Sequence, residues 1–321
     1  MTTMRDVARK AGVGVGTVSR ALSDTGYTAK ATREKIIAAA DEMGYEYESP
    51  ARPPVKALTI GIMLPLLKHP FFSKMTDCIE TELHERGYRC LIYDNCNNDI
   101  HQSEALDMLD EGILSGLIAL GDPPCGFSGR GKRAIVTMDR RWGEDVPLVH
   151  SDHAMGGRLA AEAFLESGCR RVIQFMGGNL STSLTTRHSV LERVLRDNGC
   201  QVTSVQTPWN FMGYSYDRSV VRDYWNVIRD MDGCMTNDIA ALSCLSIASE
   251  MGLKVPEQLR IIGYDGTEIT RLCHPALSVV EQDCPALARV CADRLAELMD
   301  GGKPSEMETV VPVIWKKRGT T

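Results

Sequence analysis

Short apolar runs alternate with amphipathic stretches from residue 58 to residue 264, and this alternation constrains the fold more than any other feature. The apolar runs are predicted to be strands at 58–64, 89–93, 116–120, 134–138, 172–175, 202–205, 233–235 and 260–264. Helical periodicity lies between them at 72–86, 103–111, 155–166, 183–198, 218–229 and 239–251. Such alternation predicts an α/β fold with doubly wound parallel sheets that carry helices on both faces.

The strands and helices fall into two series, and the second begins near residue 155. Two series predict two lobes, each built on its own sheet. In open parallel sheets, ligands bind outside the carboxyl ends of the strands. We therefore expect a ligand where the strand ends of the two lobes face each other.

The N-terminal segment has a purely helical pattern. Thr3 and Asp6 are typical of a helix N-terminus, and Gly12 ends that helix. A second short helix is predicted over 15–22, and a third from about 30 to 43. Helix, tight turn, helix, loop and helix in this order indicate a helix-turn-helix unit.

The charge of the chain is unevenly distributed. The whole chain carries a net charge of −6 at pH 7, which alone would argue against a nucleic-acid partner. Residues 1–35, however, hold seven basic and three acidic side chains, whereas the remainder holds 29 basic and 39 acidic ones. A basic head on an acidic body is typical of a tethered DNA reader.

The head carries the motif Asp6-Val-Ala-x-x-Ala-Gly-Val-x-x-x-Thr-Val-Ser-Arg-Ala-Leu, followed by Thr32-Arg33 and Gly44-Tyr45. This motif closely resembles the head of the lactose/galactose-repressor (LacI/GalR) family, in the same order and spacing. The resemblance implies that three residues of the second helix read bases and that their neighbours face phosphates or cap the turn. The implied DNA-binding residues are Thr3, Val15, Gly16, Thr17, Ser19, Arg20, Thr32 and Arg33.

Arg20 is the only one of the three implied base-reading residues that can make a bidentate contact with guanine. Val15 can touch a thymine methyl group, and Gly16 can read nothing itself. The alternative is that Arg20 is only a solvated charge on a helix.

The segment after the head departs from the family. Family members continue into a short hinge helix whose leucine wedges into the minor groove and kinks the DNA. Here that leucine is missing, and Pro50, Pro53 and Pro54 favour an extended, semi-rigid linker. Whether the DNA is kinked is therefore left open.

Motifs across the rest of the chain, among them His69-Pro-Phe-Phe, Asp139-Arg140, Ser151-Asp152 and Gly263-Tyr-Asp, resemble the two-lobed, periplasmic-binding-protein-like (type I) body of the same family. The chain ends on a segment that resembles the family's terminal strand and basic tail. The resemblance implies a homodimer that binds double-stranded operator DNA under the control of a small-molecule effector, most simply a carbohydrate. The implied domains are a head at 1–47, a proline-rich linker at 48–56, a first lobe at 57–152 and 284–310, and a second lobe at 153–283 and 311–321.

Carried over residue by residue, the resemblance implies that the effector site contains His69, Phe71, Asp139, Arg140, Ser151, Arg187, Trp209, Asn237, Asp265 and Gln282. These residue types suit a polyol, because carboxylates and amides bind vicinal hydroxyls and a guanidinium binds two oxygens at once. An aromatic ring can cover the apolar face of a sugar. We expect Arg187 and Asp265 at strand-to-helix turns.

Some of these assignments have alternatives. Asn237 could instead cap the helix that follows it. His69 stands where the family usually has asparagine and could face solvent. Two arginines and a histidine against two aspartates leave room for an acidic or phosphorylated sugar.

Other classes of function are disfavoured. Asp139 and Asp265 could imitate the carboxylate pair of a glycosidase. Ser151, Asp152 and His153 could suggest a catalytic triad, but they are adjacent, and neighbouring side chains diverge too much to form one. No phosphate-binding loop or dinucleotide fingerprint occurs, so we do not expect an enzyme. A periplasmic sugar-binding protein would lack the basic head. A corepressor-type regulator that responds to a purine or to a phosphorylated or acidic metabolite remains an alternative.

The eleven cysteines contain no C-x-x-C pair and are expected to be reduced, with no metal or cofactor. No apolar run is long enough to span a bilayer, and the N-terminus lacks an apolar signal region. We therefore expect a cytoplasmic protein without membrane association.

Overall fold

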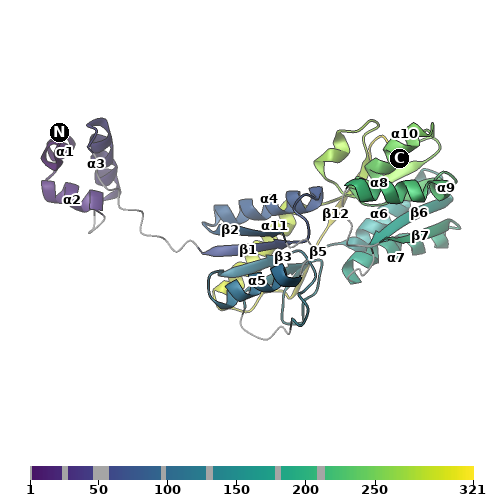
Figure 1. Ribbon diagram of the computed structural model, residues 1–321, viewed down its shortest axis with the longest axis horizontal. Coiled ribbons are helices and arrows are strands. Elements are labelled where there is room, and N and C mark those ends of the chain that lie inside the picture. Colours follow the sequence, from purple (N-terminus) through teal and green to yellow (C-terminus); the bar gives the residue numbers. More distant parts are fainter. Residues whose placement is uncertain are drawn as a thin grey trace. The chain divides into compact units, whose positions relative to one another are not determined.

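The computed structural model describes residues 2–23, 28–45, 58–94, 99–127, 133–177, 182–207 and 214–321. The described residues divide into two compact units, with the division between Ala57 and Leu58 (Figure 1). The predicted linker 48–56 and Trp209 lie outside the described residues.

The first unit is the predicted three-helix head, with α1 (Met4–Ala11), α2 (Val15–Ser23) and α3 (Lys30–Glu42). The backbone N–H and the hydroxyl of Thr3 both donate to the Asp6 carboxylate, at 3.0 and 2.5 Å. Gly12 ends α1 in the left-handed region at φ 66°. Val18 of α2 is fully buried in a core that all three helices share. The helices predicted from the local sequence are therefore confirmed.

The second unit contains two six-stranded sheets, and both are parallel except where β12 pairs with β10. The first has the order β11-β5-β4-β3-β1-β2, with strands Glu308–Val311, Leu148–Ser151, Ile135–Met138, Gly116–Ala119, Thr59–Leu64 and Arg89–Asp94. The second has the order β12-β10-β9-β8-β6-β7, with strands Val313–Lys316, Ser278–Gln282, Arg260–Asp265, Gly233–Met235, Arg171–Gly177 and Gln201–Thr207. The predicted two-lobed α/β body is confirmed.

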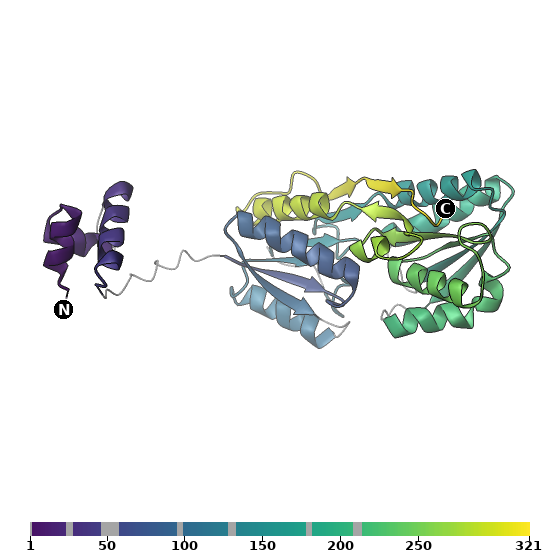
Figure 2. The same cartoon turned by 90° about the horizontal axis from the view of Figure 1, so that it is seen from above.

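Helices cover both faces of each sheet, as the sequence predicts. The first sheet is flanked by α4 (Pro70–Glu85), α5 (Asp99–Asp110) and α11 (Cys284–Met299). The second is flanked by α6 (His153–Glu166), α7 (Thr182–Asp197), α8 (Tyr214–Asp223), α9 (Trp225–Ile228) and α10 (Asp238–Glu250), with a 3₁₀ turn at Glu268–Arg271. Helices α4 and α11 lie side by side on one face of the first sheet (Figure 2).

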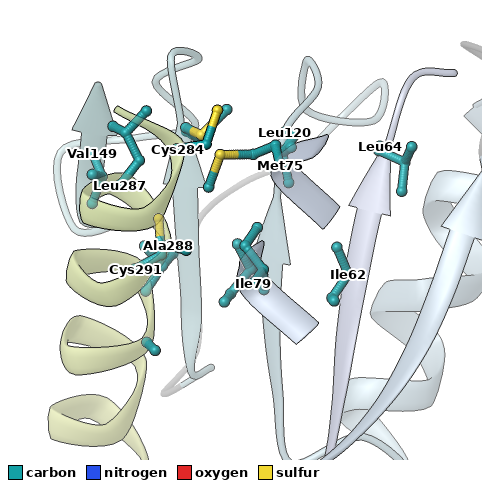
Figure 3. Close-up of a cluster of buried hydrophobic side chains, with 14 of the residues drawn as sticks. Ile62, Leu64, Met75, Ile79, Leu120, Val149, Cys284, Leu287, Ala288 and Cys291 are labelled. Atoms are coloured by element: carbon teal, nitrogen blue, oxygen red, sulfur yellow. The ribbon is translucent and has the colours of Figure 1, made fainter. Parts of the chain in front are cut away.

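Alternation along β1 explains why that sheet is covered on both faces. Ile62 and Leu64 pack against α4 and α11, and Figure 3 shows Met75 of α4 and Leu287 of α11 in the same cluster. Met63 points to the other face and packs against α5. Because successive strand residues point to opposite faces, an uninterrupted apolar strand requires helices on both sides.

The chain passes between the two lobes three times. It leaves the first sheet at the end of β5 and enters α6, returns from β10 into α11, and crosses again from β11 to β12. The last crossing occurs at Pro312, which has no backbone N–H and cannot donate to a sheet ladder. The domain boundaries expected from the sequence stay a prediction, although these crossings fall close to them.

The structure also differs from the sequence predictions. Strands β5 and β10 and helix α11 were not predicted, and the expected helix over 218–229 is two helices separated at Tyr224. The expected terminal strand is β12, and after it the Arg318 guanidinium donates to the Thr270 hydroxyl and the Leu277 carbonyl.

We predict that Gly157→Ala destabilises the protein by about 2 kcal/mol, within the usual range for overpacking. A Cβ at Gly157 of α6 would lie 2.2 Å from the carbonyl oxygen of Arg187, so α6 and α7 would have to separate. Urea unfolding measures the loss. Gly143→Ala, where a Cβ meets nothing within 4 Å, is the matched control and should leave stability within about 0.5 kcal/mol. Equal stabilities of the two variants would contradict the close packing of α6 on α7.

Candidate functional site

Polar side chains gather at the carboxyl ends of strands from both sheets. Ser151 ends β5, Asp265 ends β9 and Gln282 ends β10, and all three are buried. The Ser151 hydroxyl donates to Gln282 Oε1 at 2.7 Å, and Gln282 Nε2 donates to Asp265 Oδ1 at 2.8 Å. The structure thus brings together three of the predicted effector residues in one chain of hydrogen bonds that joins the lobes.

The two predicted carboxylates have unusual backbones. Asp139 (φ 58°) and Asp265 (φ 111°) are the two residues other than glycine with positive φ among the described parts of the chain. Positive φ is costly for a residue with a Cβ and persists only when the surroundings impose it. Such strain concentrates at binding and catalytic sites, so its presence at these two residues marks them as a candidate site.

Asp139 directly follows β4 and is 7% exposed. Its Oδ1 lies 3.0 Å from Nε2 of His153, whose Nδ1 lies 3.0 Å from the Tyr264 hydroxyl. Burial opposes ionisation of Asp139, but the hydrogen bond from His153 and the positive charge of Arg187 favour it, and the pKa of Asp139 is lowered. Burial also lowers the pKa of His153, so its ring is neutral at physiological pH.

Arg187 lies inside α7, and the expectation that it occupies a strand-to-helix turn is wrong. Its guanidinium carbon is 4.1 Å from the centroid of the Tyr264 ring, a cation–π contact. Its Nε donates to Nε2 of His188 at 3.3 Å. The positive charge of Arg187 acts on both Asp139 and Asp265 and favours the ionised form of each carboxyl. The half-buried Arg187 therefore contributes to the charge balance of both carboxyls.

Burial raises the pKa of Asp265 to about 6, although Arg187 and the Gln282 hydrogen bond act against this shift. The negative charge of Asp139 adds to the shift in the same direction. Asp265 is thus the carboxyl of the pair that protonates first on acidification.

His69 precedes α4 and is only 4% exposed, so the alternative that it faces solvent is wrong. Neither ring nitrogen has a hydrogen-bond partner, and burial lowers the pKa of His69 to about 4. The ring packs against Phe72 with centroids 5.4 Å apart. Leaving a buried polar group unsatisfied costs about 1–3 kcal/mol, so these nitrogens mark a place where a ligand group would be favourable.

The remaining predicted effector residues have other surroundings. Arg140 is buried, and its Nε lies 3.5 Å from Asp122. Phe71 belongs to the hydrophobic core of the first lobe. Asn237 caps α10 by accepting from the N–H of Ala240 at 2.9 Å, which is the alternative that the sequence left open. Their contact with a ligand stays a prediction.

Sequence reasoning missed His153, Tyr264 and Lys74. Lys74 of α4 donates to the carbonyl of Gly266 in the second lobe at 3.2 Å. His153 entered the sequence analysis only as part of a hypothetical triad. Asp152 instead accepts from the N–H of Met155 at 2.7 Å and caps α6, so the three adjacent side chains bind different partners.

In the head, the three residues implied to read bases lie on the exposed surface of α2. Val15 is 41% exposed, and Gly16 and Arg20 are also exposed. The Arg20 guanidinium lies 3.4 Å from the Thr17 hydroxyl. Thr3 is exposed at the start of α1, whereas the rest of the predicted set, Thr17, Ser19, Thr32 and Arg33, is half-buried.

None of the described helices has the length and apolarity needed to cross a membrane. Within the same residues, no group of three or more His, Cys, Asp or Glu side chains could hold a metal ion.

Three family models match the chain. Residues 3–47 match the bacterial regulatory proteins of the lacI family, and residues 57–209 match the periplasmic binding proteins and sugar binding domain of the LacI family. Residues 161–321 match a periplasmic binding protein-like domain.

Curated relatives match over nearly the whole chain. The ribose operon repressor of Bacillus subtilis is 31% identical over 328 residues, covering 100% of this chain and 99% of that one. The sucrose operon repressor of Streptococcus mutans is 30% identical over 307 residues, covering 92% of each.

Among solved structures, the lac repressor dimer bound to operator and the anti-inducer ONPF has a TM-score of 0.73 at 24% identity, covering 100% of this chain and 99% of that one. Together with the family matches, this likeness confirms a helix-turn-helix head on a two-lobed, type I periplasmic-binding-protein-like body.

We predict that His69→Asn makes stability less sensitive to acid. Because the pKa of His69 is about 4 in the folded protein and 6.5 in the unfolded chain, the unfolded chain binds the proton more tightly. The stability contributed by neutral His69 is complete above about pH 6.5 and is lost as pH falls toward 4, amounting to about 3 kcal/mol.

Urea unfolding between pH 7 and 4 should therefore show a decline that is shallower by about that amount in His69→Asn. His84→Asn, at an exposed position of α4, is the control and should follow the wild type. Parallel curves for His69→Asn and the wild type would rule out a buried, neutral His69.

Proposed function

Because the chain belongs to the LacI family of bacterial transcriptional repressors, which are not enzymes, we propose that it is a cytoplasmic repressor whose affinity for double-stranded operator DNA is set by a sugar or sugar derivative. Its relatives include repressors of ribose and sucrose operons. The head reads the operator, and the two lobes hold the effector at the carboxyl ends of their strands.

The observation that carries this proposal is the pair of buried carboxylates with positive φ angles, Asp139 and Asp265. Asp139 and Asp265 offer acceptors to hydroxyl groups, and Arg187 can donate two hydrogen bonds. His69 has two buried nitrogens without protein partners, one a donor and one an acceptor when the ring is neutral. Alternating donors and acceptors suit the hydroxyls of a polyol.

The balance of charge favours an uncharged sugar over an acidic or phosphorylated one. His69 is neutral at physiological pH because burial lowers its pKa to about 4. Arg140 is close to Asp122, and the positive charge of Arg187 acts on both Asp139 and Asp265. The excess of positive charge suggested by the residue types is therefore absent, and an anion would gain little here.

The proposed repressor pairs through its body, which would present two heads to a near-palindromic operator. The edge strand β2 supports self-association, because Leu91 and Ile92 are 38% and 43% exposed on it. An apolar edge strand is normally covered by another element or another chain. The effector shifts operator affinity only through its different affinities for the two arrangements of the lobes.

A thermal-shift screen of the full chain against neutral, acidic and phosphorylated sugars and purines tests this proposal. A ligand at 100 times its dissociation constant should add about 2.7 kcal/mol of stability. We predict that a neutral sugar stabilises the wild type and that Arg187→Ala and Asp265→Asn abolish the shift. Arg193→Ala, at an exposed position of the same helix, is the control and should retain it.

A hit among phosphorylated sugars or purines would instead support the corepressor-type alternative, and an operator-binding assay with the hit gives its sign. If no compound shifts the wild type while it still binds DNA, the proposal of a sugar effector is wrong.

We further predict that Arg20→Ala removes discrimination at one base pair of the operator, at a cost of about 1–3 kcal/mol. Binding selection with randomised operators measures the preference at each position. Arg9→Ala, which removes a cation of α1 that is 81% exposed, should at most weaken binding to all sequences equally. Unchanged discrimination in Arg20→Ala would defeat the assignment of base reading to this residue.

A further inference from the structure

His153 lies between the two lobes and is 2% exposed. We propose that His153 is a positioning residue that ties Asp139 of the first lobe to Arg187 of the second, so that a change at one side chain is felt at the other. Only the biological role of this connection rests on the proposed function. In that role, it would transmit binding of the effector to both lobes.

The hydrogen bonds of His153 have a fixed direction. A carboxylate accepts hydrogen bonds and cannot donate them, so Nε2–H of His153 donates to Asp139 at 3.0 Å. Burial keeps the ring neutral by lowering its pKa, and Nδ1 is therefore an acceptor that receives the Tyr264 hydroxyl at 3.0 Å. A rigid ring thus sets the separation between Asp139 and Tyr264.

Tyr264 has little freedom to move independently. A Cβ at Gly156 would lie 2.3 Å from its hydroxyl oxygen, so α6 fits closely around the ring. The Tyr264 ring also contacts Arg187, whose guanidinium carbon lies 4.1 Å from the ring centroid. A shift of Arg187 therefore reaches His153 through a packed aromatic ring.

Arg187 is held from a second direction within its own lobe. It donates to Nε2 of His188, whose Nδ1–H must then donate to Oε1 of Gln174 at 2.9 Å. Gln174 in turn donates to the Ser204 hydroxyl at 2.9 Å. This side is anchored in the second sheet, and on the other side the contacts of Tyr264 and His153 lead from Arg187 to the first lobe.

The charged and titratable groups that face His153 come from several elements. Asp139 favours protonation of its ring, whereas Arg187 and His150 oppose it. The His150 ring stacks on His153 with centroids 6.4 Å apart. Neutral His153 is thus the form on which the relay depends.

The test needs neither effector nor DNA, so its failure is distinct from failure of the proposed function. The full chain is compared by hydrogen exchange at residues 135–142. The Asp139 amide is the reporter, because it donates to the Val149 carbonyl at 3.0 Å in the first lobe. Arg187→Met should raise exchange there at least about fivefold, the low end of typical coupling between sites.

In the background of His153→Leu, the effect of Arg187→Met on the Asp139 amide should disappear. Tyr264→Phe keeps the ring under Arg187 but removes the hydroxyl, and it should also remove the effect even if His153→Leu fails to fold. Arg193→Met, on the same helix as Arg187, should leave exchange of the Asp139 amide as in the wild type. In the background of Ile79→Val, which only loosens the first-lobe core, Arg187→Met should still raise that exchange as it does in the wild type. An equal effect of Arg187→Met with and without the relay, or no effect in the wild type, would overturn the proposal.

Discussion

The parallel arrangement of the strands that end near the site is the constraint on which the rest of the structure depends. Parallel strands bring all their carboxyl ends to one edge of a sheet, and the chain crosses between the sheets three times near those edges. Side chains far apart in sequence thereby meet, as Ser151 and Gln282 do at 2.7 Å. The apolar packing of helices on both sheets holds the strands in register. The candidate site is therefore a product of the core, and the Tyr264 ring belongs to both.

Burial then determines the electrostatic state of the site. A charge removed from water must find a partner or become neutral. Asp139 has partners in His153 and Arg187 and stays ionised. Asp265 is partly neutralised, since its pKa rises to about 6. His69 is neutral, because burial lowers its pKa to about 4. These responses turn a set of residues that reads as cationic in the sequence into one that is nearly balanced in the fold.

The sequence predicts those features that depend on local spacing. The head is one, because caps, turns and helical periodicity lie within a few residues of each other, as Thr3, Asp6 and Gly12 do. The α/β class is another, because each strand and helix carries its own periodicity. Strand β5 escaped prediction because only Leu148 and Val149 are apolar before His150 interrupts the run. The predicted roles of the site residues themselves stay predictions.

The relay through His153 and Tyr264 could not be predicted, because it joins residues separated by 14 and 111 positions. The burial of His69 likewise depends on packing around the start of α4, which a single sequence does not reveal. The expectation that Arg187 lies at a strand-to-helix turn was wrong although the helix itself was predicted, because the predicted helix over 183–198, like α7, already contains Arg187.

The positive φ angles of Asp139 and Asp265 also limit how such a site can change over generations. At these positions Asp, Asn and Gly are tolerated, whereas branched or bulky side chains would strain the backbone. A lineage that shifts to a new ligand would therefore keep its short polar side chains at 139 and 265 and vary neighbours with ordinary backbones, His69 among them. Backbone geometry, rather than chemistry alone, would separate the conserved part of the site from the part that is free to diversify.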